Sequence, residues 1–247
     1  MSKYAHDTIV PFKESELSKK QQVASMFDKI AFRYDFLNRF LSAGIDVGWR
    51  KKALRQLVSL QPKAILDVAT GTGDVAILAD KILSPKKITG IDISTGMLEI
   101  GKAKILKLGL QNKIELVKGD SEIINFPDAS FDAITVAFGV RNFENLEKGL
   151  SEMLRVLRPG GKLVVLEFSK PKQGAVSAFY SLYMRFFASN VGKMISKNDE
   201  AYRYLNDSVQ QFPEGQRFVS ILNTVGYTNT YAKRLTLGIC TIYCGSK

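Results

Sequence analysis

The chain is poor in the residues that bind metals and form disulfides. Its 247 residues include two cysteines and one histidine. Cys240 and Cys244 fall four positions apart in one expected strand, about 13 Å from each other, which is too far for a disulfide. Two cysteines and the single His6 are too few for a structural zinc site. The sequence therefore predicts reduced thiols in a cytoplasmic protein, no metal, and a solvated His6 in a polar leader.

Long hydrophobic runs are also missing. No stretch of 18 apolar residues occurs, so no transmembrane helix is expected. The N-terminus is polar and mixed in charge, unlike a secretory signal. Hydrophobic residues still make up 45% of the chain, which is enough for the core of one α/β domain with additions. We expect a cytoplasmic protein whose only membrane contact is peripheral, at the inner face.

Positive charge is in excess but unevenly distributed. The net charge is +11. Residues 1–60 carry 11 basic and 6 acidic side chains, residues 61–150 carry 11 and 12, and residues 151–247 carry 13 and 6. The middle of the chain is therefore near neutral and both flanks are basic. Nucleic acid and an anionic membrane surface are the two partners that suit such flanks, and a merely solvated surface has the same composition.

Apolar strands alternate with helical segments through the middle of the chain. The expected strands cover residues 64–69, 87–92, 113–118, 131–137 and 161–167, and helices begin near Asp74, Thr95 and Asn142. This alternation predicts an α/β fold with a parallel, doubly wound sheet. Two β-rich runs, 227–234 and 237–244, predict an antiparallel pair that closes the sheet. Helices over 20–27 and 47–60 are expected to precede it, after a loose leader at 1–18.

A two-glycine turn in residues 65–74 is the most informative stretch. An apolar strand leads through Asp67 to Gly71 and Gly73, and a helix follows. Glycines without a Cβ let the backbone approach a ligand closely, and open α/β folds bind cofactors at this edge of the sheet. Ala76 stands where a dinucleotide fingerprint needs a third glycine, which disfavours a nicotinamide dehydrogenase. The turn resembles the S-adenosylmethionine loop of class I methyltransferases, although a tight turn in another α/β protein would look similar.

Acidic residues end the next two expected strands. Asp92 lies 19 residues past Gly73, the spacing of a carboxylate that accepts both hydroxyls of a cofactor ribose. The alternative for Asp92 is an N-cap of the helix that begins near Thr95. Asp120 and Ser121 end the third strand and are expected beside the adenine, although a turn-forming Asp-Ser pair is the simpler interpretation.

Several longer strings narrow the family. They are MFDKIA at 26–31, YD at 34–35, GID at 44–46, WR at 49–50, FGVRN at 138–142, EMLRVL at 152–157, LEFSKP at 166–171, YRYL at 202–205 and LTLGI at 235–239. Together they resemble the quinone-biosynthesis C-methyltransferases, over nearly the whole chain from about residue 20. The strings at 138–142 and 166–171 are much more specific than the glycine turn.

This resemblance implies S-adenosylmethionine (SAM) as methyl donor and a polyprenyl hydroquinone as acceptor. It implies a Rossmann-like class I methyltransferase, with a mostly parallel seven-stranded sheet and a C-terminal antiparallel hairpin. Residues 1–60 would cover the active site, and residues 61–247 would form the SAM-binding domain with a helical lid insertion at about 172–225. The aromatic segment 179–187 would belong to that lid and touch lipid, although a plain amphipathic helix is the alternative. The expected cofactor contacts are Asp67, Gly71, Thr72, Gly73, Asp92, Ile93, Asp120, Ser121 and Ala137.

The chain departs from the family pattern at three places. Thr70 stands where members often have glycine, and it keeps a small residue in the turn. Asp120 and Ser121 stand where some members have Asn-Ala, which weakens their assignment. Ala137 replaces a serine, so a side-chain contact to SAM is lost there.

Carbon methylation sets the expectations for catalytic residues. A ring carbon must be held in line with the methyl group while a neighbouring phenol loses its proton, and no covalent nucleophile or metal is needed. Arg141 is expected to lower the phenol pKa and stabilise the oxyanion, with a structural ion pair as the alternative. Asn142 would orient the ring oxygen or a water, unless it is a helix N-cap. Tyr34 and Asp35 would fold over the acceptor, with Asp35 as proton acceptor.

The acceptor itself is not settled by the sequence. Demethylmenaquinol is the main interpretation, and the ubiquinone precursor 2-polyprenyl-6-methoxy-1,4-benzoquinol, alone or in addition, is the alternative. An RNA methyltransferase is permitted by the fold and the charge. However, the chain lacks an Asn/Asp-Pro-Pro-aromatic motif, a cysteine suited to attack a base and an RNA-binding module, so no nucleic-acid partner is expected. A non-enzymatic SAM- or lipid-binding protein is disfavoured by the string at 138–142, and a homodimer is compatible with the sequence.

Overall fold

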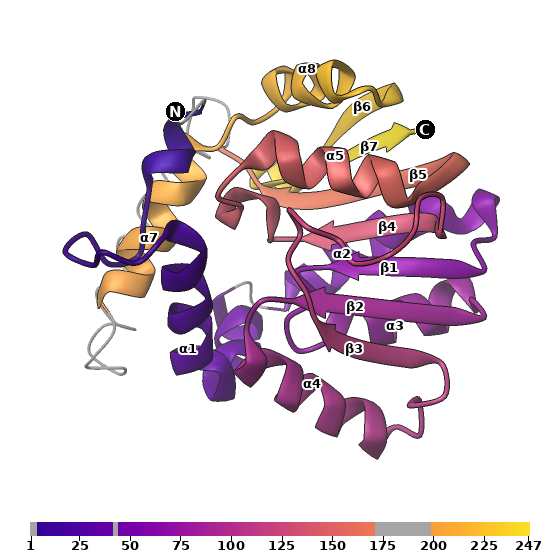
Figure 1. Cartoon of the computed structure of the whole chain (residues 1–247), viewed down its shortest axis with the longest axis horizontal. Coiled ribbons are helices and arrows are strands. Elements are labelled where there is room, and N and C mark those ends of the chain that lie inside the picture. Colours follow the sequence, from indigo (N-terminus) through magenta and orange to yellow (C-terminus); the bar gives the residue numbers. More distant parts are fainter. Residues whose placement is uncertain (1–3, 42–43, 171–198) are drawn as a thin grey trace.

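The computed structural model describes residues 4–41, 44–170 and 199–247, without the side chains of residues 33–41 and 199–202 (Figure 1). A seven-stranded sheet with the strand order β3-β2-β1-β4-β5-β7-β6 runs through this part of the chain. The strands are β1 Ala64–Val68, β2 Lys87–Asp92, β3 Ile114–Lys118, β4 Phe131–Ala137, β5 Leu157–Phe168, β6 Thr228–Leu235 and β7 Cys240–Ser246.

The first five strands are parallel, and the last two form the predicted antiparallel pair. β1 pairs in parallel with β2 and β4, and the parallel ladder extends to β3 on one side and β5 on the other. β7 is inserted between β5 and β6, antiparallel to both. The predicted fold class is therefore confirmed. Cys240 and Cys244 are both buried free thiols, as the spacing along β7 requires.

Helices cover both faces of the sheet. Their bounds are α1 Lys19–Leu41, α2 Ile45–Leu54, α3 Asp74–Leu83, α4 Thr95–Lys107, α5 Leu146–Val156, α7 Asp199–Gln211 and α8 Gln216–Val225. α5 and α8 pack on one face, while α2, α3 and α4 pack on the other (Figure 1). The central strands are buried on both faces, which is why Ile65, Leu66 and Ile134 are fully inaccessible and why these strands read as apolar runs.

α1 and α7 lie beyond the carboxyl ends of the parallel strands (Figure 1). Val23 and Met26 of α1 share a small hydrophobic cluster with Tyr204 of α7. α1 continues to Leu41, well past the predicted end at residue 27, and the second predicted helix ends at Leu54 before a short 3-10 segment, η2 Arg55–Leu60. The two N-terminal helices thus stand where the sequence places them, with different ends.

The leader is packed rather than loose, which corrects the expectation for His6. Residues 5–8 form a 3-10 turn, η1 Ala5–Thr8, and the His6 side chain is completely buried. Its ring stacks on Tyr4 and meets the edge of Phe212 in the segment after α7. The Nζ of Lys19 donates to the His6 carbonyl oxygen at 2.7 Å. Phe212 lies more than 200 residues along the chain from His6, so the polar composition of the leader gave no sign of this contact.

The helix after β4 begins later than predicted. Asn145 is its N-cap, because its side chain accepts a hydrogen bond from the backbone amide of Lys148 at 3.0 Å. Asn142 lies earlier, in the 3-10 turn η3 Val140–Asn142. The N-cap alternative for Asn142 is therefore wrong.

The expected lid insertion falls partly outside the described residues. Residues 171–198, including the aromatic segment 179–187, are not described. The end of the expected range belongs to the core, because Phe218 and Leu222 of α8 are fully buried against α5 and the sheet. Among the helices of the described residues, none has the length and apolar character needed to cross a membrane.

Candidate active site

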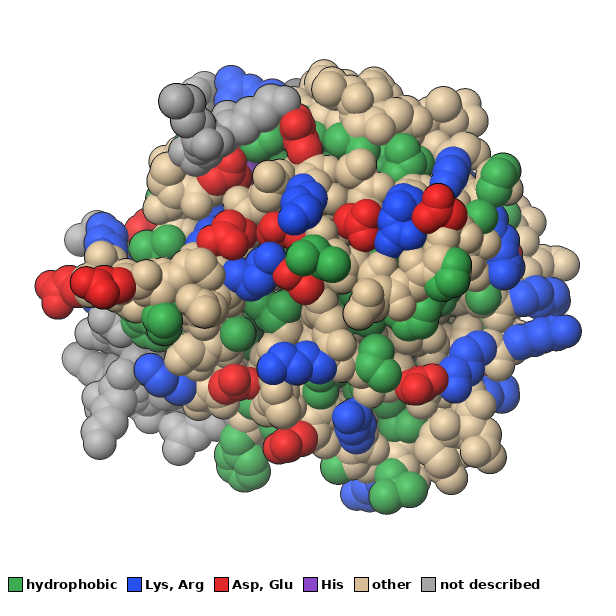
Figure 2. All heavy atoms as spheres, viewed as in Figure 1, with side chains coloured by type: hydrophobic (Ala, Val, Ile, Leu, Met, Phe, Trp, Pro, Cys, Tyr) green, Lys and Arg blue, Asp and Glu red, His purple; other side chains and the backbone are tan. Residues whose placement is uncertain are grey.

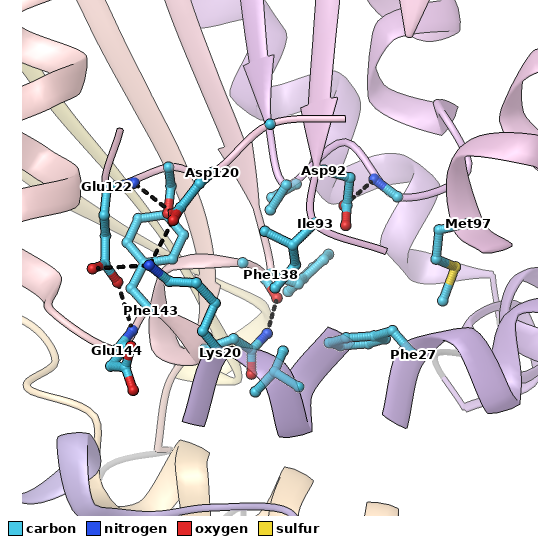
Figure 3. Close-up of a pocket in the computed structure, with 18 residues that line it drawn as sticks. Lys20, Phe27, Asp92, Ile93, Met97, Asp120, Glu122, Phe138, Phe143 and Glu144 are labelled. Carbon is cyan, nitrogen blue, oxygen red and sulfur yellow. Dashed lines mark hydrogen bonds and ion pairs between the residues drawn. The ribbon is translucent and has the colours of Figure 1, made fainter. Parts of the chain in front are cut away.

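A cavity of about 650 Å³, including its open mouth, lies at the carboxyl edge of the parallel strands. Its floor comes from the loops that follow β1, β2, β3 and β4, and one wall comes from α1 (Figure 3). This is the position at which open α/β sheets bind their ligands. Phe27 of α1 and Met97 of α4 supply apolar walls, while carboxylates from the ends of β2 and β3 supply polar ones.

The glycine turn and Asp92 form one hydrogen-bonded unit. Gly71 and Gly73 adopt φ values of 56° and 78°, which glycine takes without strain. The amide of Gly71 donates to Oδ2 of Asp92 at 2.8 Å, and the amide of Ser94 donates to Oδ1 at 2.9 Å. Burial raises the pKa of Asp92, and these amide hydrogen bonds oppose the rise. Ser94, whose Oγ accepts from the Met97 amide, is the N-cap of α4, so the N-cap alternative for Asp92 is wrong.

Asp92 retains capacity for a ligand. A carboxylate has about four lone-pair sites, and the backbone amides of Gly71, Ser94 and Ile93 donate hydrogen bonds to Asp92. The acceptor capacity that remains suits the hydroxyl groups of a ribose. The side chain also lines the cavity. The residues present therefore fit the nucleoside end of SAM.

Asp120 faces the same cavity but is held by a cation. Its Oδ1 accepts from the Glu122 amide at 2.9 Å, which is the turn geometry that the sequence left as an alternative. Its Oδ2 pairs with Nζ of Lys20 at 2.5 Å, and the same Nζ lies 3.3 Å from Oε2 of Glu122 (Figure 3). Lys20 therefore ties the first turn of α1 to the loop after β3.

Six of the nine expected cofactor residues line the cavity formed by the described residues. They are Gly71, Asp92, Ile93, Asp120, Ser121 and Ala137. Asp67, Thr72 and Gly73 lie behind it and shape the turn. Both oxygens of Asp67 accept short hydrogen bonds, from the hydroxyls of Thr70 and Thr135 at 2.6 Å each. Burial raises the pKa of Asp67 to about 6, although both hydroxyl groups oppose the rise. The Oγ1 of Thr72 accepts from Nζ of Lys104 at 2.9 Å.

Arg141 does not line the cavity formed by the described residues. Its Nη1 pairs with Oε1 of Glu167 at 2.7 Å and donates to the carbonyl oxygen of Phe138 at 2.6 Å. Both charged side chains are almost inaccessible, and the guanidinium lies over the ring of Phe168. The structural ion pair, which the sequence left open as an alternative, is thus the arrangement that the structure contains.

Asn142 lines the cavity together with Phe138 and Gly139 of the 138–142 string. Its Nδ2 is 3.4 Å from the Phe138 carbonyl oxygen, and its Oδ1 accepts from the hydroxyl of Tyr204 at 3.0 Å. Ala69 and Phe138, which also line the cavity, have φ values of 52° and 59°, a conformation that costs non-glycine residues free energy. The backbone is therefore strained at the ends of β1 and β4, where a ligand would contact it.

The sequence predicted that the N-terminal helices cover the site, but it did not identify which side chains of α1 line the cavity, and it gave α7 no role. Val23 and Phe27 line the cavity, and Oδ1 of Asp28 accepts from the Ser94 hydroxyl at 2.6 Å and the Gly96 amide at 2.8 Å. The strings at 26–31 and 202–205 marked these helices without giving them a role. Tyr34 and Asp35 also belong to α1, but their side chains are outside the described part of the chain. No group of three or more His, Cys, Asp or Glu side chains in the described part could hold a metal ion.

Solved structures with the same architecture include methyltransferases. A putative S-adenosyl-L-methionine-dependent methyltransferase from Methanococcus maripaludis superposes with a TM-score of 0.60 at 20% identity, covering 96% of this chain and 97% of that one. A phosphoethanolamine N-methyltransferase from Haemonchus contortus gives a TM-score of 0.65 at 14% identity, covering 96% and 61%. The sheet order, the antiparallel last strand and the glycine turn are those of the class I methyltransferase fold.

Sequence relatives define the family within that class. The model of the ubiE/COQ5 methyltransferase family matches residues 15–247, so the chain belongs to this family. It is 45% identical over 244 residues to the demethylmenaquinone methyltransferase of Bacteroides fragilis, covering 99% of each chain. It is 46% identical over 230 residues to the ubiquinone/menaquinone biosynthesis C-methyltransferase UbiE of Geotalea daltonii, covering 93% of this chain and 97% of that one. The resemblance seen in the sequence strings is thus confirmed, and the protein is a methyltransferase.

Proposed function

We propose that this protein transfers a methyl group from SAM to a ring carbon of a polyprenyl hydroquinone, with demethylmenaquinol as the acceptor. Relatives covering almost the whole chain, from Bacteroides fragilis and Porphyromonas gingivalis at 45% and 40% identity, carry the name demethylmenaquinone methyltransferase. The observation that carries the proposal is the cavity in which Asp92 and Asn142 both face a common space at the sheet edge.

The nucleoside end of SAM would lie between β2, β3 and α1. Asp92 would accept hydrogen bonds from the ribose hydroxyls, because its carboxylate lines the cavity. Asp120 and Ser121 would meet the adenine edge, and Ile93, Met97 and Phe27 would pack on its faces. Gly71 and its neighbours would pass close to the amino-acid end, with Asp67, Thr72 and Gly73 supporting the turn from behind.

Bound SAM supplies a methyl group that its sulfonium makes electrophilic. The new carbon–carbon bond forms as the carbon–sulfur bond breaks, the electron pair returns to sulfur, and the ring carbon then loses its proton. The protein must hold the ring carbon in line with the methyl group, and positioning alone can lower the barrier by about 7–11 kcal/mol. It must also favour the phenolate, because a ring carbon becomes nucleophilic when the neighbouring oxygen is ionised.

Asn142 and Arg141 would both favour the phenolate form of the acceptor. Asn142 faces the cavity and would hydrogen-bond the ring oxygen. Arg141 does not line the cavity, but it donates to the carbonyl oxygen of Phe138, which does line it. The positive charge of Arg141 would therefore act on the phenolate from a distance, while the carboxylate of Glu167 offsets part of that charge. A direct contact between the guanidinium and the phenolate would require Arg141 to leave Glu167. Asp35, with Tyr34 beside it on α1, is proposed as the proton acceptor.

The proposal includes peripheral contact of the protein with the inner face of a membrane, because the acceptor carries a prenyl tail. The basic flanks of the chain and the exposed apolar side chains of Phe32 and Leu17, at and just before α1, support it. Nucleic acid is not proposed as a partner, because acidic side chains lie among the basic ones over most of the face in Figure 2. A second acceptor, the ubiquinone precursor, is kept because the relative from Geotalea daltonii is named for both quinones.

A methyl-transfer assay tests the proposal. Labelled SAM is offered with reduced demethylmenaquinone and with the demethylated ubiquinone precursor, side by side, and the products are identified by mass. Label in demethylmenaquinol alone is expected. Label in both quinols would add the second activity. Label in neither, with SAM binding intact, would contradict the proposed function.

A further inference from the structure

Tyr204 connects α7 to the cavity through a single hydrogen bond. Its side chain is only 3% exposed and packs beside Val23 and Met26 of α1. Its hydroxyl donates to Oδ1 of Asn142 at 3.0 Å, across 62 residues of sequence. Asn142 lines the cavity, so the hydroxyl acts on a residue that a ligand would touch.

The orientation of the Asn142 amide follows from its two partners. The carbonyl oxygen of Phe138 can only accept a hydrogen bond, so Nδ2, which lies 3.4 Å away, must be the end of the amide that faces it. A flipped amide would place Oδ1 against that carbonyl oxygen, and two acceptors repel each other. Oδ1 therefore faces α7 and is occupied by Tyr204. The amide nitrogen has two N–H groups, and Phe138 takes one of them.

We propose that Tyr204 is a positioning residue that holds Asn142 so that its second N–H is presented to the ring oxygen of the acceptor. This inference rests on the proposed function of the site. By occupying Oδ1, the hydroxyl makes Asn142 a hydrogen-bond donor to the ligand and prevents it from acting as an acceptor. A donor at this place stabilises a phenolate more than a phenol, because hydrogen bonds to a charged oxygen are stronger.

The surroundings of Tyr204 keep it in the donating form. Burial raises the pKa of its hydroxyl, and the positive charge of Arg141 opposes this while Glu167 adds to it. The hydroxyl therefore stays protonated at every pH at which the protein would be assayed. Because Tyr204 reaches Asn142 only when α7 is docked against α1, the docking of these two helices also completes the donor geometry.

A double-mutant cycle on catalysis tests the inference. Tyr204→Phe removes the hydroxyl and keeps the ring, so kcat with demethylmenaquinol should fall about tenfold while the affinity for SAM is unchanged. In an Asn142→Ala background the same substitution should change kcat by less than twofold, because Tyr204 acts through Asn142. Tyr227→Phe is the matched control: its buried hydroxyl donates to the Leu150 carbonyl oxygen at 3.0 Å, away from the cavity. It should leave kcat unchanged.

A further variant tests the donor role alone. Asn142→Asp keeps an acceptor for Tyr204 but presents no N–H to the acceptor ring, so kcat should fall at least as far as in Asn142→Ala. Full activity of Tyr204→Phe, an equal loss in both backgrounds, or an active Asn142→Asp would each overturn the inference. Urea unfolding of every variant separates a loss of kcat from a loss of folded protein.

The same double-mutant cycle can be measured by ligand binding, without methyl transfer. If the wild-type protein methylates neither quinol, the proposed function fails, and the affinity of the S-adenosylhomocysteine-loaded protein for 1-naphthol is measured by calorimetry instead. Tyr204→Phe should weaken 1-naphthol binding several-fold in the wild-type background and leave it unchanged in the Asn142→Ala background. Equal weakening in both backgrounds, or none in either, would overturn the role of Tyr204 independently of the reaction.

Discussion

Two carboxylates at the same edge of the sheet, Asp92 and Glu167, have opposite surroundings. Asp92 ends β2 and accepts hydrogen bonds from the backbone amides of Gly71 and Ser94, while Glu167 near the end of β5 pairs with Arg141. Burial raises the pKa of both. The amides leave Asp92 with free lone pairs facing the cavity, whereas the guanidinium and the surrounding core enclose Glu167 completely. Acidic residues at strand ends therefore divide into ligand-facing and structural ones according to their partners.

Removing Arg141, the cationic partner of Glu167, should give the largest loss of stability. Arg141→Ala leaves a fully buried carboxylate without its partner, so the free energy of unfolding should fall by about 3–5 kcal/mol, measured by urea unfolding at pH 8. The loss should shrink at lower pH, because a protonated Glu167 needs no cation. The double variant Arg141→Met/Glu167→Gln should recover most of the stability. If Arg141→Ala proves as stable as the wild type, the ion pair is not what holds this end of β5.

Asp67 extends the comparison to a carboxylate held by hydroxyl groups. Its pKa is raised from 3.8 to about 6 in the folded protein. Below pH 3.8 the Asp67 carboxyl group is protonated in both the folded and the unfolded protein. As the pH rises from 3.8 to 6, this group ionises in the unfolded protein first, so the free energy of unfolding falls. The loss amounts to about 3 kcal/mol and is complete above pH 6.

Urea unfolding of the wild type and Asp67→Asn at pH 4, 5 and 6.5 measures this effect. Asparagine does not ionise, so the wild type should lose stability relative to the variant across this range. A difference between the two proteins that stays constant with pH would show that Asp67 titrates normally.

Asp92 should matter for the ligand more than for the fold. Asp92→Ala removes two charge-assisted hydrogen bonds, each worth about 1.5–3 kcal/mol, so the affinity for SAM should fall at least tenfold by calorimetry. Asp80→Ala is the control, since Asp80 pairs with Lys113 on the surface of α3. Unchanged SAM affinity in Asp92→Ala would show that Asp92 does not bind the ribose and that, like Glu167, it has a structural role.

Lys20 tests the weakest of these charge pairs. Lys20 and Asp120 are 27% and 24% exposed, so their pairing is screened by water and contributes about 0.2–1 kcal/mol. Lys20→Met loosens α1 over the cavity and should speed the release of S-adenosylhomocysteine up to about fivefold in stopped-flow measurements. Lys113→Met removes a similar pair, 3.2 Å long, away from the cavity and should leave the release rate unchanged. A slower release from Lys20→Met would contradict this role of α1.

Much of the site could be predicted because its parts are local. The glycine turn, Asp92 and Asp120 each follow a strand directly, and parallel strands bring their carboxyl ends to one edge. Arg141 and Asn142 show where this reasoning fails. They are neighbours in one string, yet Arg141 is turned toward Glu167, 26 residues further along the chain, and Asn142 faces the cavity. The direction of a side chain depends on such distant partners, which no local pattern contains.

The sequence by itself determined the order and type of the strands, the glycine turn, the reduced cysteines and the family, because these follow from periodicity, spacing and residue type. Tertiary structure alone decided that His6 is buried, that Val23 and Phe27 of α1 line the cavity, and that Tyr204 reaches Asn142. In each of these cases the contact joins segments far apart in the chain. Burial, charge pairing and amide orientation arise only when the packed fold brings those segments together.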